Sequence, residues 1–330
     1  DPRVYAKARE NLDRLIAEGA LRADDRAHYY LYRQIMGEHS QLGLVAVASC
    51  AEYSDNTIRK HEFTRPAKED DRVAHLEALD AQTGPVFVTY PADAVLDELF
   101  GRIASGEPDH DFTAPDGVQH TSWTVSSGED AQFIASRFDA IPNLYIADGH
   151  HRSAAAERVA KRRAGSGTSG LFLTVLFPHN QMQILAYNRV VRDLHGHSPE
   201  AFLGALGQVF DIEESGLPKP HGKHEICLYL EGRWRTLRPK VSSIDIDDPI
   251  KQLDVSILQD YTLAPLLGID DPRTSKRIAF VGGIRGTGEL ENLVNSGVFA
   301  CAFSLSPTSI GDLMRIADDG GIMPPKSTWF

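Results

Sequence analysis

The sequence has 330 residues, of which 42% are hydrophobic and 24% are charged, and a formal net charge of −12 at pH 7. Its length suffices for a sizeable core and favours two domains or lobes. The acidic balance argues against a non-specific grip on nucleic acid. No apolar run reaches the roughly 18 residues of a membrane span. Cys50, Cys227 and Cys301 form no CxxC pair, which favours reduced thiols in a cytoplasmic protein.

Hydrophobic periodicity predicts alternating helices and strands in the first half of the chain. We expect helices over 4–20, 66–79, 93–103, 129–139 and 153–163, and strands over 29–34, 42–48, 86–90, 118–125 and 144–147. The glycine- and serine-rich segment 164–170 is typical of a linker or mobile loop. We therefore place a lobe boundary there, with an N-terminal lobe over 1–164 and a C-terminal lobe over 165–330.

The C-terminal lobe mixes strands and helices in an order typical of a compact α+β layer. We expect one strand that starts at 171, further strands over 183–191, 209–214, 277–281 and 298–305, and a hairpin over 224–238. The expected helices lie over 199–208, 257–267, 288–295 and 307–317. The whole chain is thus predicted to be a mixed α+β protein.

The run Asp148-Gly149-His150-His151-Arg152 lies between a predicted strand end and the helix-forming run that starts at Ser153. A glycine turn into a helix N-terminus favours anions, because several backbone N–H groups lack partners there and the helix dipole is positive. Crowding one acid, two imidazoles and a guanidinium into such a turn is costly for stability alone. We interpret it as a phosphate-handling active-site turn.

A capping role for Asp148 would place His151 and Arg152 on the same side of the helix as the cap. Arg152 could then clamp a phosphate while the first-turn N–H groups bind its other oxygens. His151 could donate to the transferring group, and Asp148 could orient an imidazole or hold Mg²⁺. The alternative is a capped helix with a surface salt bridge, which explains neither histidine.

The charged stretch 59–72 is the second candidate. Glu62 lies between His61 and Phe63, upstream of a helix start marked by Pro66, and could take a proton from a substrate hydroxyl. The basic residues that could bind anionic groups are Arg59, Arg65 and Arg72. A solvated charged loop is the competing interpretation, because charge runs usually are only that.

The tail segment Lys326-Ser327-Thr328 is the third candidate. It is similar to the end of a P-loop, although the upstream glycines of that motif are missing. A frayed tail is the alternative. The glycine-rich run 282–288 is better explained as a strand-to-helix turn, and the spacing of His195, His197, His221 and His224 matches no zinc pattern.

These segments together resemble the domain-of-unknown-function family numbered ten-fifteen. The matching runs, in order, are Arg59–Thr64 with Glu69–Arg72, Ala147–Arg152, Leu253–Gln259, Ala302–Thr308 and Met323–Thr328. The resemblance spans nearly the whole chain. Members of the family have further residues before the point where this chain starts.

The Asp-Gly-His-His-Arg turn also resembles that of free serine kinases in the ParB/sulfiredoxin-like superfamily. The resemblance implies a ParB/sulfiredoxin-like nucleotide-binding core with an additional α+β layer, and phosphoryl transfer from ATP or ADP, with Mg²⁺, to a hydroxyl of L-serine or a related amino acid. Sulfinic-acid repair is not expected, because His150 and His151 stand where sulfiredoxins have a cysteine. A nucleotide-dependent switch and a phosphohydrolase stay open as alternative functions. Whether the protein forms a homodimer is also left open.

The expected site residues fall into three groups. The catalytic group comprises Glu62, Asp148 and His151, with Asp148 also the metal ligand; the nucleotide group comprises Gly149, His150, Arg152, Ser153, Lys326, Ser327 and Thr328; the substrate group comprises Arg59, His61, Thr64 and Arg72.

Overall fold

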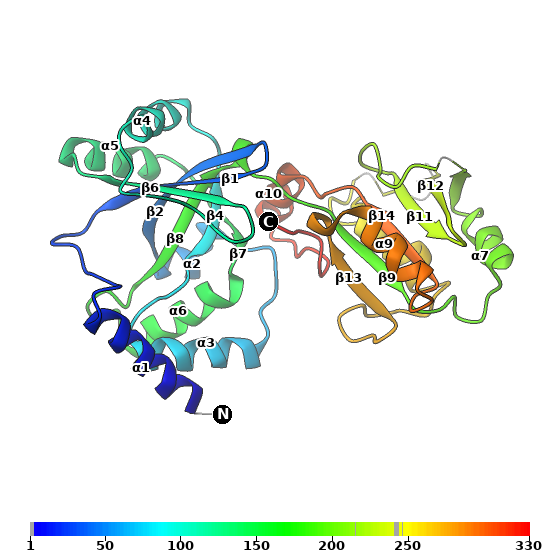
Figure 1. Cartoon of the computed structure of the whole chain (residues 1–330), viewed down its shortest axis with the longest axis horizontal. Coiled ribbons are helices and arrows are strands. Elements are labelled where there is room, and N and C mark those ends of the chain that lie inside the picture. Colours follow the sequence, from blue (N-terminus) through cyan, green and yellow to red (C-terminus); the bar gives the residue numbers. More distant parts are fainter. Residues whose placement is uncertain (1–2, 215, 241–243, 246) are drawn as a thin grey trace. The chain divides into compact units, whose positions relative to one another are not determined.

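The computed structural model describes residues 3–214, 216–240, 244–245 and 247–330. The chain forms two compact units, unit 1 over Asp1–Gln183 and unit 2 over Ile184–Phe330. Each unit has its own sheet and its own helices (Figure 1). The chain is therefore a mixed α+β protein, as the sequence predicted.

Unit 1 is built on an eight-stranded sheet. Its strands are β1 (Tyr29–Met36), β2 (His39–Ser49), β3 (Ile58–Arg59), β4 (Val86–Tyr90), β5 (His110–Thr113), β6 (Gln119–Val125), β7 (Leu144–Asp148) and β8 (Leu171–Pro178), in the order β3-β7-β4-β8-β2-β1-β6-β5. The pairs β3–β7 and β4–β8 are parallel. The sequence did not predict β5, whose residues are all exposed, so no apolar alternation marks it.

The expected boundary after residue 164 is wrong. Strand β8 pairs with both β4 and β2, so the residues up to Gln183 belong to unit 1. The segment 164–170 is a hydrogen-bonded turn between helix α6 (His150–Arg162) and β8: the N–H of Gly165 donates to the Ala160 carbonyl at 2.9 Å. Gly165 and Gly167 supply positive φ angles to this turn, and the segment does not join two lobes.

One face of the unit 1 sheet carries the core. Leu31 lies directly opposite both Leu44 and Trp123, and Leu44 lies opposite Leu176, so these side chains share a face. They belong to one buried cluster with residues of α4 (Ala94–Ala104), α5 (Gly128–Asp139) and α6. The apolar stripes of these helices therefore cover that face.

Two further helices form an outer layer on α6. Helix α3 (Pro66–Leu79) packs against it through a small cluster of Val73, Ala155 and Val159. Helix α1 (Arg3–Ala17) lies on α3, where the Tyr5 hydroxyl donates to Asp71 at 2.9 Å (Figure 1). The remaining short helices of unit 1 are α2 (Cys50–Ser54) and the 3₁₀ turn η1 (His179–Gln181).

Unit 2 is built on a six-stranded antiparallel sheet. Its strands, in the order β10-β12-β11-β14-β9-β13, are β9 (Tyr187–Val191), β10 (Phe210–Glu213), β11 (Ile226–Leu230), β12 (Arg233–Pro239), β13 (Ile278–Gly282) and β14 (Cys301–Leu305). Its helices are α7 (Pro199–Leu206), α8 (Asp254–Leu258), η3 (Gln259–Leu263), η4 (Gly283–Arg285), α9 (Gly286–Asn295) and α10 (Ile310–Asp318). The helix expected over 257–267 thus begins earlier, at Asp254, and continues as the π-helical turn η3.

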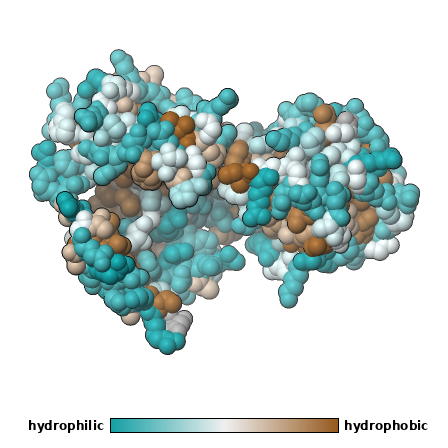
Figure 2. Space-filling model, viewed as in Figure 1, coloured by the Kyte–Doolittle hydropathy of each residue, from teal (hydrophilic) through white to brown (hydrophobic). Residues whose placement is uncertain are grey.

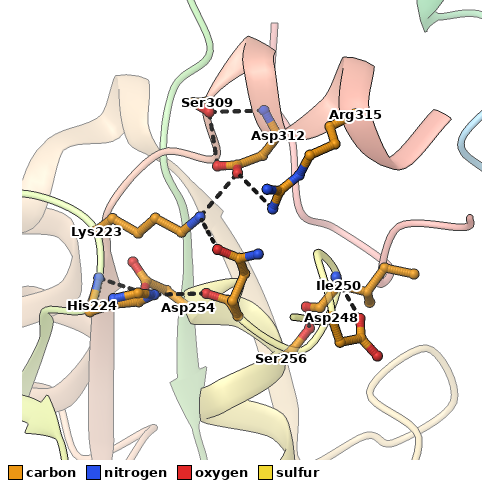
Figure 3. A network of polar contacts seen from close by, with 10 residues as sticks. Lys223, His224, Asp248, Ile250, Asp254, Ser256, Ser309, Asp312 and Arg315 are labelled. Carbon is orange, nitrogen blue, oxygen red and sulfur yellow. Dashed lines mark hydrogen bonds and ion pairs between the residues drawn. The ribbon is translucent and has the colours of Figure 1, made fainter. Parts of the chain in front are cut away.

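A polar network in unit 2 ties α8 and α10 to the turn before β11 (Figure 3). The Lys223 ammonium donates to Asp312 at 3.0 Å and to Gln252 at 3.2 Å. The carboxylate of Asp254 accepts the His224 N–H at 2.8 Å. Burial raises the pKa of Asp254 to about 7. This network gives His224 a structural role.

Hydrophilic side chains cover most of the face of unit 2 seen in Figure 2. Among the described residues, no helix is both long and apolar enough to cross a membrane. The three cysteines are free and buried, as expected.

Candidate active site

The parallel pairing of β3 and β7 brings the two best candidates of the sequence together. Arg59 lies beside Tyr145 in register, so the chain leaves both strands at the same edge of the sheet. Glu62 follows β3 there, and Asp148 ends β7. The distance between Glu62 Oε2 and His150 Nδ1 is 3.8 Å.

Gly149 forms the turn between β7 and α6. Its φ of +106° is a backbone conformation that L-residues rarely adopt. A Cβ at this position would also lie 2.8 Å from Arg152 Nη2. The turn therefore requires glycine for its backbone angle, and an added Cβ would also displace the flexible Arg152 side chain.

Asp148 does not cap α6, so the arrangement that depended on such a cap does not form. The N-cap residue is Gly149, and no side chain makes the cap hydrogen bond. The helix begins at His150, earlier than the sequence suggested, and the Gly149 carbonyl accepts the N–H groups of Arg152 at 2.8 Å and Ser153 at 3.0 Å. The N–H groups of His150 and His151 have no intrahelical acceptor at these first positions, and the helix dipole is positive here.

Arg152 pairs with Asp148 on the rim of the turn, with 2.8 Å between Nη2 and Oδ2. Both side chains are well exposed, at 39% and 66%, so this pair contributes about 1 kcal/mol or less to stability. Within the described part of the chain, the buried Nε of Arg152 has no hydrogen-bond partner. The guanidinium thus keeps one buried donor that no group of the described residues uses.

His150 is a buried, neutral imidazole. Its Nε2 accepts the backbone N–H of His61 at 3.4 Å, which assigns the ring proton to Nδ1, the atom that faces Glu62. Burial lowers the pKa of His150 well below its ordinary value, and the neighbouring His61 lowers it further. The contact with Glu62 is therefore one between a neutral N–H and a carboxylate, and at 3.8 Å it is longer than a hydrogen bond.

His61 lies beneath the turn. Its ring packs edge-to-face on His150, with 4.5 Å between centroids. It is 2% exposed, and burial lowers its pKa to about 4. The imidazole of His61 is therefore not on the surface where the expected substrate contact would need it.

His151 holds the other end of the Glu62 loop. Its Nε2 accepts the N–H of Arg65, the N-cap residue of α3, at 3.1 Å. Both histidines of the turn thus bond to the backbone on either side of Glu62. The Glu62 carboxylate itself is 58% exposed and open to solvent.

The remaining expected residues of unit 1 fall outside this arrangement or on its rim. Ser153 is fully buried, and its hydroxyl donates to the His150 carbonyl at 3.1 Å, so it has little left for a ligand. The Thr64 hydroxyl donates to Glu69, which also pairs with Arg158. The half-buried Arg59 ends β3, and Arg72 lies within α3.

Lys326, Ser327 and Thr328 belong to unit 2, whereas the Asp148–Arg152 turn belongs to unit 1. The tail is packed and not frayed: the Leu185 N–H donates to the Trp329 carbonyl at 2.7 Å. Ser327 is buried, and its hydroxyl donates to the Pro324 carbonyl.

Against this geometry, comparisons with known proteins give one family and several distant structural relatives. The model of the family described as "Protein of unknown function (DUF1015)" matches residues 1–256, and the chain belongs to this family. Among curated proteins, none has a significant match.

Three solved structures are distantly similar to this chain. Free serine kinase, as a glutamate-to-glutamine mutant in complex with AMP, has 11% identity and a TM-score of 0.43, with 86% of each chain covered. SbnI with a C-terminal truncation, from Staphylococcus aureus, has 11% identity and a TM-score of 0.43, with 86% of this chain and 81% of that one covered. A conserved hypothetical protein from Pyrococcus furiosus has 12% identity and a TM-score of 0.39, with 86% and 89% covered.

Proposed function

We propose that the Asp148–Arg152 turn binds nucleotide phosphates and that the protein is a small-molecule kinase. It transfers a phosphoryl group from ATP or ADP to a hydroxyl of free L-serine or a related amino acid. The observation that carries this proposal is the position of Glu62, whose exposed carboxylate lies 3.8 Å from His150 at the N-terminus of α6. A candidate base and a candidate phosphate site therefore share one end of unit 1.

The phosphate groups would bind at the start of α6. The N–H groups of His150 and His151 point from the positive end of the helix dipole. Arg152 would exchange its exposed partner Asp148 for a phosphate, which costs little because that ion pair is solvated. The proposed phosphate contacts of His150, His151 and Arg152 all belong to unit 1.

The one acidic residue of the turn, Asp148, fits Mg²⁺ only as an ion that the nucleotide brings with it. Within the described residues, no group of three or more His, Cys, Asp or Glu side chains could hold a metal. Asp148 offers one exposed carboxylate, and Mg²⁺ at kinase sites is bound through one or two carboxylates plus phosphates and water. Bound there, the ion would neutralise phosphate charge.

The transfer itself needs positioning and charge neutralisation more than covalent chemistry. The acceptor hydroxyl oxygen forms a bond to the terminal phosphorus, and the bond from that phosphorus to the leaving phosphate oxygen breaks. Glu62 takes the hydroxyl proton. His150 and His151 contribute by fixing the loop on which Glu62 stands.

The test is incubation of the full chain with radiolabelled ATP or ADP, Mg²⁺ and a panel of hydroxyl amino acids, with chromatography of the products. Glu62→Gln should retain nucleotide affinity by calorimetry and lose about 10²-fold or more in turnover. Glu98→Gln, an exposed glutamate on α4, serves as the matched control and should change neither.

Three outcomes would contradict the proposal. Failure of the wild type to bind either nucleotide removes the phosphate site. Nucleotide hydrolysis with no phosphorylated acceptor would favour a phosphohydrolase or a nucleotide-dependent switch instead. Full turnover in Glu62→Gln would remove Glu62 as the base.

A further inference from the structure

The loop that carries Glu62 leads into helix α3, which runs parallel to α6. At the start of α3, the N–H of Arg65 donates to His151 in the first turn of α6. Near the end of α3, Glu77 pairs with Arg162 in the last turn of α6. The two helices therefore begin at the same end of unit 1 and lie side by side (Figure 1). A residue of α6 that holds the start of α3 can thus also hold the loop before it.

Arg158 of α6 is such a residue. Its guanidinium contacts Glu69 at 3.2 Å and Asp70 at 2.6 Å, both near the start of α3. The Glu69 side chain is 18% exposed and that of Arg158 is 30% exposed, so solvent screens this ion pair less than one at the open surface. The pair fixes the start of α3 against the middle of α6.

Glu69 also binds the loop itself. Its carboxylate accepts the hydroxyl proton of Thr64, which lies two residues after Glu62. Thr64 was expected to contact the substrate, but a hydroxyl has only one proton to donate, and Glu69 takes it. A continuous series of contacts therefore runs from Arg158 through Glu69 and Thr64 to the segment that carries Glu62. We call these three side chains the polar clamp.

We infer that Glu69 is a positioning residue for the candidate base Glu62: it holds the Glu62 loop through Thr64 and is itself held by Arg158. A general base must stand within hydrogen-bond reach of the proton that it removes. Greater freedom of the loop would therefore reduce turnover and leave nucleotide affinity unchanged. The catalytic consequence rests on the proposed function, whereas the restraint on the loop does not.

The first measurement does not depend on catalysis. It follows hydrogen exchange of the Arg65 amide, whose N–H is bound by His151, by NMR of the full chain. Thr64→Val keeps the shape of the side chain but removes its hydroxyl, and it should speed this exchange by about tenfold. Arg158→Met should have the same effect. Arg162→Met breaks an ion pair farther along the same two helices, and as the matched control it should leave the exchange unchanged.

Exchange at a core amide separates a local effect from a general one. The Val88 amide lies in the buried strand β4 and should exchange slowly in every variant. Unchanged exchange at Arg65 in both Thr64→Val and Arg158→Met would refute the polar clamp. Equal increases at Arg65 and Val88 would also overturn it, because the variants would then have loosened the whole of unit 1.

The second measurement tests the catalytic consequence by steady-state kinetics of phosphoryl transfer. Thr64→Val should lower kcat by about tenfold at unchanged KM for nucleotide and acceptor, and Thr64→Ser, which restores the hydroxyl, should recover it. Adding Thr64→Val to Glu69→Ala should cost no more than Glu69→Ala alone, because both remove the same contact.

Two kinetic outcomes are decisive in the other direction. A raised KM for the acceptor at unchanged kcat in Thr64→Val would make Thr64 a substrate contact and overturn the positioning role of Glu69. A wild type without phosphoryl transfer would refute the proposed function, and the exchange at Arg65 would still decide whether the polar clamp restrains the loop.

Discussion

His150 accepts the backbone N–H of His61 through Nε2 and turns its protonated Nδ1 toward Glu62, so one buried ring joins the first turn of α6 to the loop after β3. This hydrogen bond is buried, and leaving a buried N–H without an acceptor lowers the free energy of unfolding by about 1–3 kcal/mol. This relationship makes His150 important both for stability and for the position of Glu62.

Replacing His150 by phenylalanine should therefore lower the free energy of unfolding by about 1–3 kcal/mol, since ring volume is kept but the acceptor for the His61 N–H is lost. Urea denaturation followed by circular dichroism measures it. His110→Phe, the same change at an exposed position of β5, is the control and should have little effect. Unchanged stability in His150→Phe would mean that the 3.4 Å contact contributes nothing.

Gly149→Ala should destabilise the chain by about 1–3 kcal/mol, chiefly because an L-residue is strained at a φ of +106°, while the new Cβ also displaces the guanidinium of Arg152. Gly117→Ala is the matched control: its φ of +85° is also positive, but nothing lies within 4 Å of its Cβ. The excess loss in Gly149→Ala over Gly117→Ala, measured by thermal unfolding, isolates the contact with the guanidinium. Equal losses would show that only the backbone angle matters.

Arg152→Ala should weaken ADP binding by about tenfold or more, which is the change in affinity expected when one charge-assisted hydrogen bond is lost. The free energy of unfolding should change by about 1 kcal/mol or less. The reason is that its ion pair with Asp148 is exposed, whereas a phosphate at the helix start would use the guanidinium fully. Arg162→Ala breaks a similarly exposed pair, with Glu77, and serves as the control. Loss of ADP affinity in both variants would point to bulk charge and not to the turn.

Asp254 should make unit 2 less stable as the pH rises. Burial raises its pKa to about 7, so the folded state keeps the proton after the unfolded state has lost it. The contribution of Asp254 to the free energy of unfolding is complete below the unfolded-state pKa of roughly 4. It is lost as the pH rises from there to about 7, and the loss is on the order of 4 kcal/mol at most.

Asp254→Asn keeps an acceptor for the His224 N–H and removes this titration. Its stability relative to wild type should therefore increase from pH 4 to pH 8, as chemical denaturation at each pH would show. Asp211→Asn, at an exposed carboxylate, should give a flat difference. A flat difference for Asp254→Asn as well would mean that its carboxyl titrates normally.

Sequence periodicity predicted the helices and strands that surround the turn, and it located the turn itself. It placed the start of α6 too late, because no side chain caps this helix and Gly149 does so with its backbone alone. It missed β5, which has no apolar face, and it took a tight glycine turn at 164–170 for a linker. Each of these errors concerns backbone hydrogen bonds, which side-chain patterns do not report.

The same limit applies to the candidate site: the sequence shows which residues are unusual, but not which groups they contact. The sequence marked Glu62 and the two histidines as unusual, but the parallel register of β3 and β7 decides that they meet, and such long-range pairing is not encoded locally. Both histidines were expected to face a ligand, yet one ring nitrogen of each accepts a hydrogen bond from a backbone N–H of the Glu62 loop.

The burial of His61 and His150 has a consequence for how the turn responds to acidity. Both rings stay uncharged through the range from about pH 5 to pH 8, in which an ordinary histidine would titrate. Neither ring therefore adds positive charge at the start of α6 in this range, where the helix dipole and the Arg152 guanidinium supply positive potential. A change of pH within this range would therefore leave unchanged the charge that these two rings present to an incoming phosphate.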